Sequence, residues 1–222
     1  MKIYGDVISG NCLKVKWTAD ALGLPYTWVQ TDVVKGETRT PAYLAKFPQG
    51  QVPAVEFDDG RTLAQSNGIV RYLARGSRLL PDDGFAQAKV DEWLFWEQYS
   101  HEPYVAVCRF HMKYLGKSKD EREAWRVERG EKALDFIEQQ LAGRDFLAGP
   151  ALTIADMPMK AASTSPNDPA SENGSRAAKR ACASNKATSD TRRSERRDKW
   201  VRLRVSWSSS APTAAIAPSR SG

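Results

Sequence analysis

The fold is decided by residues 47–69, which read FPQGQVPAVEFDDGRTLAQSNGI. Within them, two short runs suit β-strands, Val52–Phe57 and Thr62–Ala64. The turn between these runs, Asp58–Arg61, contains an Asp-Gly pair, which supplies the positive φ angles of a tight hairpin. Ser66 has the side chain of a helix N-cap and precedes an apolar helical face. We therefore expect an antiparallel hairpin that leads into a helix.

The residues before this hairpin alternate between strand and helix patterns. Lys2–Gly5 suits a short strand, and Cys12–Leu22 repeats apolar residues at helical spacing. Tyr26–Val33 is rich in β-branched and aromatic residues, which favours a second strand parallel to the first across the helix. A short helix is possible at Pro41–Phe47. The expected order up to the helix after the hairpin is β-α-β-α-β-β-α.

The next part of the chain has only helical patterns. Phe85–Leu115 forms one long pattern, in which Pro103 removes a backbone donor and predicts a kink. Asp120–Leu141 predicts a second helix whose inward positions include Leu134 and Ile137. The tryptophans of this region fall at helical spacing, so core packing is their expected role. Two antiparallel helices are therefore expected.

A capping box at Thr153–Asp156 marks the start of a third helix, but the sequence that follows is unsuited to one. Residues 160–199 are dominated by Ala, Ser, Thr, Asn, Lys and Arg without periodicity. Such a segment buries too little apolar surface to offset the entropy of ordering its backbone. Only Val201–Trp207 alternates as an amphipathic strand would. We expect a disordered tail over residues 157–222 and hypothesise a frameshift near residue 157, since shifted GC-rich coding sequence gives this composition.

The excess of basic residues lies in the same part of the chain, after residue 156. The whole chain has a formal net charge of +6, and residues 157–222 hold 13 Lys and Arg against 5 Asp and Glu. Clustered basic residues attract phosphate backbones. Nucleic-acid binding is therefore an alternative for the tail, where Trp200 and Trp207 stand near arginines, although charged low-complexity tails are usually only solvated. We expect no nucleic-acid partner.

Several classes of protein do not fit the sequence. It opens without a basic segment followed by an apolar one, and no stretch approaches 18 uninterrupted apolar residues, so no membrane partner is expected. The three cysteines form no C-x-x-C pair, which favours a reducing compartment and a cytoplasmic protein. His101 and His111 lack the spacing of a metal site, so no metal is expected.

Three motifs together resemble the amino-terminal domain of the glutathione S-transferase family, in the family's order and at its spacing. They are Ser9-Gly10-Asn11-Cys12-x-Lys14, Phe47–Val55 and Leu63–Ile69. The resemblance, to bacterial theta-like, beta-like and nu-like classes, continues through Trp96–Tyr99, Leu147 and Thr153–Asp156. It implies an α/β thioredoxin-like glutathione-binding domain over residues 1–77. An incomplete all-helical carboxy-terminal domain over residues 85–156 and the tail would follow.

The resemblance also implies catalytic residues. Glutathione's thiol is mostly protonated at neutral pH, and a transferase must stabilise the thiolate. Ser9 would donate its hydroxyl to the sulfur at the start of a helix, and Asn11 is a second candidate donor. The alternative is that either residue merely caps the helix. Cys12 lies where the helix has begun, so a packed residue is the favoured role over a mixed disulfide with glutathione.

Glutathione-binding residues follow from the other two motifs. Val52-Pro53 resembles the family's cis-proline, which exposes the Val52 backbone to pair with the cysteine main chain of glutathione. The alternative is a plain strand-entry proline. Gln65 would contact the γ-glutamyl amine and Ser66 its carboxylate at a helix start, unless Ser66 only caps the helix. Gln51 is a weaker candidate for the glycyl end.

The implied function is glutathione transfer to an electrophilic small molecule, with glutathione as co-substrate and detoxification as the general role. The alternative is a glutathione-binding protein with little or no turnover, because the helical domain is truncated. Tyr104, Cys108 and His111 share a helical face that would border the electrophile pocket. By the same resemblance, a homodimer is expected.

Overall fold

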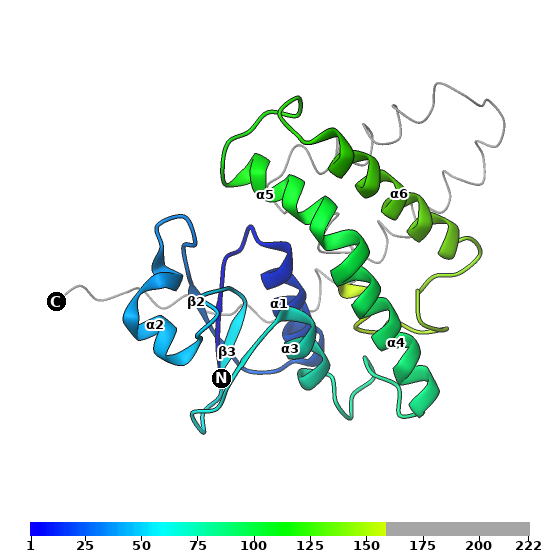
Figure 1. The fold of residues 1–222 in the computed structure, drawn as a ribbon. Coiled ribbons are helices and arrows are strands. Elements are labelled where there is room, and N and C mark those ends of the chain that lie inside the picture. Colours follow the sequence, from blue (N-terminus) through cyan, green and yellow to red (C-terminus); the bar gives the residue numbers. More distant parts are fainter. Residues whose placement is uncertain (159–222) are drawn as a thin grey trace. The chain divides into compact units, whose positions relative to one another are not determined.

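The computed structural model describes residues 1–158, and the remaining residues lie outside this description (Figure 1). The expected tail, the strand at Val201–Trp207 and the nucleic-acid alternative therefore lie outside the described residues. The described part begins with a four-stranded mixed sheet in the order β2-β1-β3-β4. Its strands are β1 (Lys2–Gly5), β2 (Thr27–Gln30), β3 (Ala54–Glu56) and β4 (Thr62–Ala64). The β1–β2 pair is parallel and the β3–β4 pair is antiparallel, as the βαβ and hairpin patterns predicted. The β1–β3 pair, for which the sequence made no prediction, is also antiparallel.

Four helical elements belong to this α/β part: α1 (Gly10–Leu22), the 3₁₀ turn η1 (Glu37–Arg39), α2 (Pro41–Lys46) and α3 (Ser66–Leu73). Alternate strand residues face opposite sides of the sheet. Ile3 and Val55 join the core cluster that includes α1 and α3, whereas Tyr4 and Ala54 join the smaller cluster on α2. Figure 1 shows α1 and α3 beside each other and α2 on the other side of the sheet. The thioredoxin-like order predicted from the sequence is confirmed.

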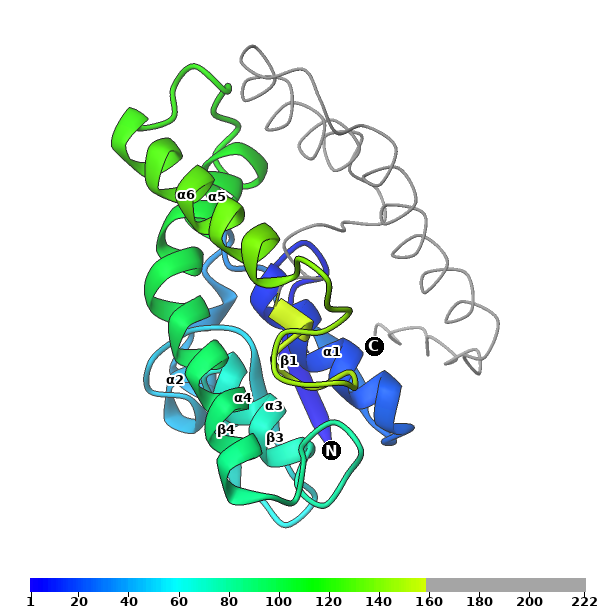
Figure 2. The same ribbon diagram turned by 90° about the vertical axis from the view of Figure 1, so that its right-hand side faces the viewer.

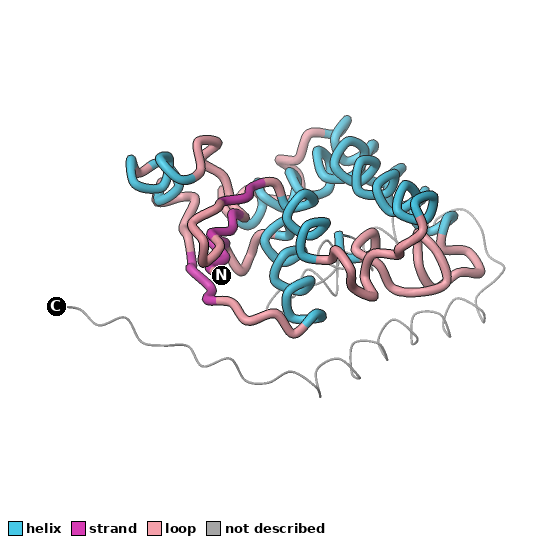
Figure 3. Tube along the Cα trace, turned by 90° about the horizontal axis from the view of Figure 1, so that it is seen from below, coloured by secondary structure: helices cyan, strands magenta, loops and turns pink. Residues whose placement is uncertain are grey.

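The helical part is a long antiparallel hairpin of helices. It runs from α4 (Gly84–Trp96) through a π-helix, η2 (Glu97–Ala106), into α5 (Val107–Lys113), and returns as α6 (Ala124–Gln140). Figure 3 shows these helices gathered on one side and the strands on the other. Pro103 lies inside η2, where the sequence predicted a kink. Because proline has no N–H to donate to the i−4 carbonyl, the wider π-helical turns accommodate it.

The buried face of α6 differs from the prediction. Ala133 and Ile137 are buried, but Leu134, expected to point inward, is 36% exposed. The reason is close packing at Gly130, where an added Cβ would lie 3.4 Å from Val105 Cγ2. This contact turns Gly130, Ala133 and Ile137 of α6 toward the core, and Leu134 lies at the edge of that buried face. The predicted core role of the tryptophans is confirmed for Trp93, which is 7% exposed, but it is wrong for Trp125, which is 48% exposed.

The capping box closes the described part. Asp156 Oδ2 accepts from the Thr153 N–H at 2.9 Å, and Oδ1 accepts from the Leu147 N–H at 2.9 Å. Met157 and Pro158, which the sequence placed in the tail, are helical and buried. Figure 2 shows this short yellow-green segment beside α1. One apolar core includes Ile3, Trp93 and Met157, and the domain boundaries near residues 77 and 85 stay predictions.

Candidate functional site

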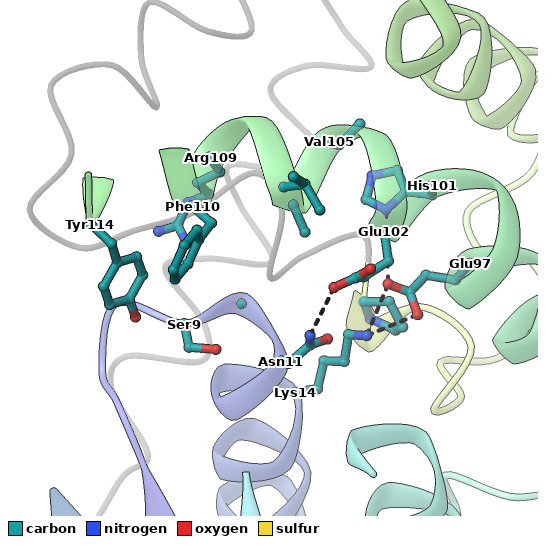
Figure 4. A pocket seen from close by; sticks show the side chains of 14 residues that line it. Ser9, Asn11, Lys14, Glu97, His101, Glu102, Val105, Arg109, Phe110 and Tyr114 are labelled. Carbon is teal, nitrogen blue, oxygen red and sulfur yellow. Dashed lines mark hydrogen bonds and ion pairs between the residues drawn. The ribbon is translucent and has the colours of Figure 1, made fainter. Parts of the chain in front are cut away.

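A pocket of about 200 Å³ lies between the start of α1 and the η2–α5 helix (Figure 4). Ser9, Gly10 and Asn11 form the wall on the α1 side. The facing wall comes from η2 and α5 and includes Val105, Arg109, Phe110 and Tyr114. Two of the predicted site residues, Ser9 and Asn11, therefore border one cavity.

Ser9 is the N-cap of α1. Its Oγ accepts from the Cys12 N–H at 3.4 Å, which is the capping geometry left open by the sequence. A capping hydroxyl uses an oxygen lone pair, so its O–H hydrogen stays available to donate to another group. Capping and thiolate stabilisation are therefore compatible at Ser9. The unpaired N–H groups of the first helical turn add positive potential at the same place.

The loop that carries Ser9 is hydrogen-bonded to the α5 region. Buried Asp6 accepts from the Ile8 N–H through Oδ1 at 2.9 Å and from the Tyr114 hydroxyl through Oδ2 at 2.9 Å. The Arg109 guanidinium donates to the Ile8 carbonyl. These contacts join residues about a hundred positions apart and fix Ser9 at the pocket wall.

Asn11 connects the starts of α1 and α3. Its Oδ1 accepts from the Ser66 hydroxyl at 3.3 Å, and its Nδ2 donates to Glu102 Oε1 at 3.2 Å. An amide carries two N–H donors, so one is left for a ligand. The structure thus brings Ser66 and Asn11 together although they are 55 positions apart.

The sequence predicted Ser66 as the N-cap of α3, but the structure places it inside the helix. The N-cap is Gln65, with no side-chain cap, and Ser66 is the first helical residue. Gln65 has φ 67° and ψ 112°, a conformation that costs a non-glycine residue about 1–3 kcal/mol and clusters at binding sites. The N–H groups at the start of α3 consequently lack a capping side chain and suit a carboxylate.

The expected cis bond is present between Val52 and Pro53. Within residues 1–158, no main-chain hydrogen bond uses the N–H or C=O of Val52, so its backbone is open to an extended ligand. Gln65 Nε2 donates to Gln49 Oε1 at 2.7 Å and lies 3.4 Å from Gln51 Oε1. Gln51 therefore lies beside Gln65, and Gln49 is a third amide that the sequence interpretation missed.

Cys12 is fully buried, and its predicted packing role is confirmed. Burial raises the pKa of its thiol to about 11, although the Ser9 hydroxyl acts in the opposite direction. Hardly any thiolate then exists at neutral pH. A role for Cys12 as a nucleophile has no support in this environment.

Alkylation tests the state of Cys12. Because iodoacetamide reacts with thiolates, we expect Cys12 to react about 100-fold more slowly at pH 7.5 in the folded protein than in the guanidinium-unfolded chain. Site-resolved mass spectrometry would measure both rates, with half-buried Cys108 as the internal comparison. Equal rates in the two states, with protection of Cys12 by glutathione, would contradict this assignment.

One expectation about the pocket was wrong. Tyr104, Cys108 and His111 do not line it, whereas Val105, Arg109 and other residues on a neighbouring face do. The face was derived from α-helical spacing, but η2 is π-helical over ten residues, and its wider turns shift the register of every later side chain. Hydrophobic spacing alone could not reveal this shift.

A buried ion pair at the pocket floor was also missed. Lys14 Nζ lies 2.8 Å from Glu97 Oε2, with side-chain exposures of 3% and 2%. Asn67 Nδ2 donates to the same oxygen at 3.2 Å, and His101 Nδ1 lies 3.9 Å from Glu97 Oε1. The only signals in the sequence were Lys14 and Glu97 within the resembling motifs, with no indication of their pairing.

Two further properties concern residues 1–158 alone. The described helices include none with the length and apolar character that a membrane span requires. No group of three or more His, Cys, Asp or Glu side chains within this part is arranged to hold a metal ion. Neither finding extends to residues 159–222.

Comparisons with known proteins agree with the geometry. The family model described as glutathione S-transferase, N-terminal domain, matches residues 8–75. Glutathione S-transferase-like protein LUC7 of Fusarium sp is 32% identical over 168 residues, which cover 70% of this chain and 73% of that protein. The probable glutathione S-transferase GSTF2 of Oryza sativa is 33% identical over 71% of this chain and 76% of its own length.

Solved structures similar to this chain are also described as glutathione S-transferases. A glutathione S-transferase from Pseudomonas fluorescens is 42% identical, with a TM-score of 0.70, over 83% of this chain and 94% of that one. A possible glutathione S-transferase from Rhodopseudomonas palustris is 33% identical, with a TM-score of 0.74, over 98% of each chain.

Proposed function

Because the chain belongs to the glutathione S-transferase family, we propose that it binds glutathione across the starts of α1 and α3 and activates the thiol for attack on an electrophilic small molecule. The Ser66–Asn11 hydrogen bond carries this proposal. It joins the helix start suited to the γ-glutamyl carboxylate to the helix start suited to the sulfur. One tripeptide can then reach both.

The binding mode follows from three features of the α/β part. The Val52 N–H and C=O, next to the Pro53 cis bond, would pair with the cysteine main chain of glutathione as an added strand does. Gln65 would accept from the γ-glutamyl ammonium, with Gln51 beside it. Ser66 would donate its backbone N–H to the carboxylate, and its hydroxyl would turn from Asn11 to donate there as well. The pocket beside Ser9 would then receive the electrophile.

The chemistry assigned to the site is thiolate stabilisation. Ser9 Oγ–H donates to the sulfur, Asn11 supplies a second N–H, and the start of α1 adds a favourable potential. The thiol proton leaves to solvent before the sulfur attacks an electrophilic carbon. No metal is required for these steps.

Wider properties of the protein are proposals on the same basis. We propose a cytoplasmic, detoxifying homodimer. Phe85, Phe95 and Tyr99 support dimerisation, because they are 76%, 75% and 82% exposed on α4 and the start of η2.

Glutathione binding and turnover test the proposed function together. We expect the full chain to bind glutathione in calorimetry and to conjugate 1-chloro-2,4-dinitrobenzene. Ser66→Ala should weaken glutathione binding about tenfold, since it removes a hydrogen bond to a charged group. Exposed Ser118 lies outside the site, and Ser118→Ala is the matched control.

The outcomes separate the two functions weighed from the sequence. Binding without conjugation would favour a glutathione-binding protein with little turnover. Absence of glutathione binding by the unaltered chain would rule out both. Equal affinity of Ser66→Ala and the unaltered chain would remove Ser66 from the site.

A further inference from the structure

The pocket beside Ser9 has two chemically different ends. Figure 4 shows Arg109, Phe110 and Tyr114 on the side of Ser9, and Glu97, His101 and Glu102 on the side of Asn11 and Lys14. At the second end the carboxylates are partnered, although both ring nitrogens of buried His101 lack a hydrogen-bond partner within the described residues. Glu97 pairs with Lys14, and Glu102 accepts from Asn11.

The first end contains an unsatisfied cationic donor. Arg109 Nη1 donates to the Ile8 carbonyl, whereas its Nη2 is buried and has no hydrogen-bond partner within the described residues. The neighbouring carboxylate of Asp6 already accepts from Tyr114 and from the Ile8 N–H. A buried N–H without an acceptor is unfavourable, and a ligand oxyanion that accepts from it forms one of the stronger hydrogen bonds.

A flat aromatic surface adjoins this donor. Phe110 and Tyr114 stack with ring centroids 4.8 Å apart and an interplanar angle of 24°. Tyr114 is held in place by its bond to Asp6. Planar ligands pack well against such rings. A guanidinium edge next to an aromatic face suits a planar molecule that carries negatively charged oxygen.

We propose that Arg109 is a specificity-determining residue that selects planar electrophiles bearing a carboxylate or another oxyanion. This inference rests on the proposed function, because it takes the glutathione sulfur to lie at Ser9. With 4-chloro-3,5-dinitrobenzoate, the thiolate attacks the carbon that bears chlorine. The C–S bond forms, the C–Cl bond breaks, and chloride leaves with its electron pair while the carboxylate stays on Arg109.

Binding of prepared conjugates tests the proposal without requiring turnover. The glutathione conjugates of 4-chloro-3,5-dinitrobenzoate and of its methyl ester differ only in the charged group. Calorimetry would give the Kd of each conjugate and of free glutathione. We expect Arg109→Met to weaken binding of the carboxylate conjugate roughly 10- to 100-fold more than binding of the ester conjugate. Arg109→Lys, which keeps the charge, should recover part of that difference.

Arg78→Met is the matched control. Arg78 also donates to a backbone carbonyl, that of Ala21, but it lies outside the pocket. It should leave the ratio of the two conjugate affinities unchanged. The rates of conjugation of the two electrophiles should change in the same ratio as the affinities.

Each result has one meaning for Arg109. Equal losses for both conjugates and for glutathione would overturn the proposal, since Arg109 would then act only through the Ile8 loop. An unchanged ratio in Arg109→Met would overturn it as well, as would glutathione binding by a chain that binds neither conjugate. If glutathione itself does not bind, the proposed function fails first, and this inference fails with it.

Discussion

Glu97→Ala is expected to lower the free energy of unfolding by about 3–5 kcal/mol, because it leaves the Lys14 ammonium buried without its partner. The two side chains come from η2 and α1, 83 positions apart. Asn67 of α3 would lose one of its two acceptors in the same variant and keep the Leu94 carbonyl. Chemical denaturation of the full chain measures the effect.

Two variants control this measurement. Glu92→Ala removes a carboxylate that is 60% exposed and pairs with Lys89 on the same helix, so stability should change by less than about 0.5 kcal/mol. The double variant Lys14→Met with Glu97→Met removes both charges and should recover most of the loss. If Glu97→Ala costs no more than Glu92→Ala, the pair has no structural importance.

The pH dependence of this loss has a definite sign. Burial raises the pKa of Glu97, but His101 and Lys14 lower it by more, so its pKa lies below the usual range. A carboxylate with a lowered pKa stabilises the fold above its unfolded pKa, about 4.3, and this contribution disappears as the pH falls through the folded value. The difference between Glu97→Ala and the unaltered chain should therefore shrink below about pH 4.

Local chemistry made the α/β part predictable. The hairpin followed from the Asp-Gly pair at Asp59–Gly60, which depends on neighbours in the sequence. The cis bond before Pro53 was implied by the family resemblance of its motif. The N-cap of α3 was misplaced by one residue because Gln65 adopts a positive φ, which only the surrounding tertiary structure can impose.

Contacts between residues far apart in the chain could not be predicted from the sequence. Nothing near Lys14 indicates a partner in η2, and nothing near Arg109 indicates that it reaches the Ile8 carbonyl. The face of α5 was mispredicted because a π-helix shifts the register after residue 97. The residues that shape the pocket opposite Ser9 were therefore missed, while those on the Ser9 side were found.

Ser9→Ala is expected to lower kcat/KM for 1-chloro-2,4-dinitrobenzene roughly 100- to 1,000-fold near pH 6.5, because it removes a hydrogen-bond donor from the developing charge at sulfur. Glutathione binding should change by less than about threefold, since the proposed contact involves the sulfur only. Above the pKa of a free thiol, about 8.5, the thiolate forms without help. The loss of kcat/KM in Ser9→Ala should therefore shrink as the pH rises. The inflection of its pH–rate profile should move to higher pH.

A merely structural role of Ser9 predicts something different. Loss of an N-cap lowers stability by about 1 kcal/mol without moving a pH–rate profile. Thr40 provides the comparison, because its side chain caps α2 by accepting from the Tyr43 N–H at 3.3 Å and lies outside the pocket. Thr40→Ala should match the stability loss of Ser9→Ala and keep the activity. Ser9→Thr, which retains the hydroxyl, should restore much of the rate, and an unmoved profile in Ser9→Ala would leave Ser9 as a helix cap alone.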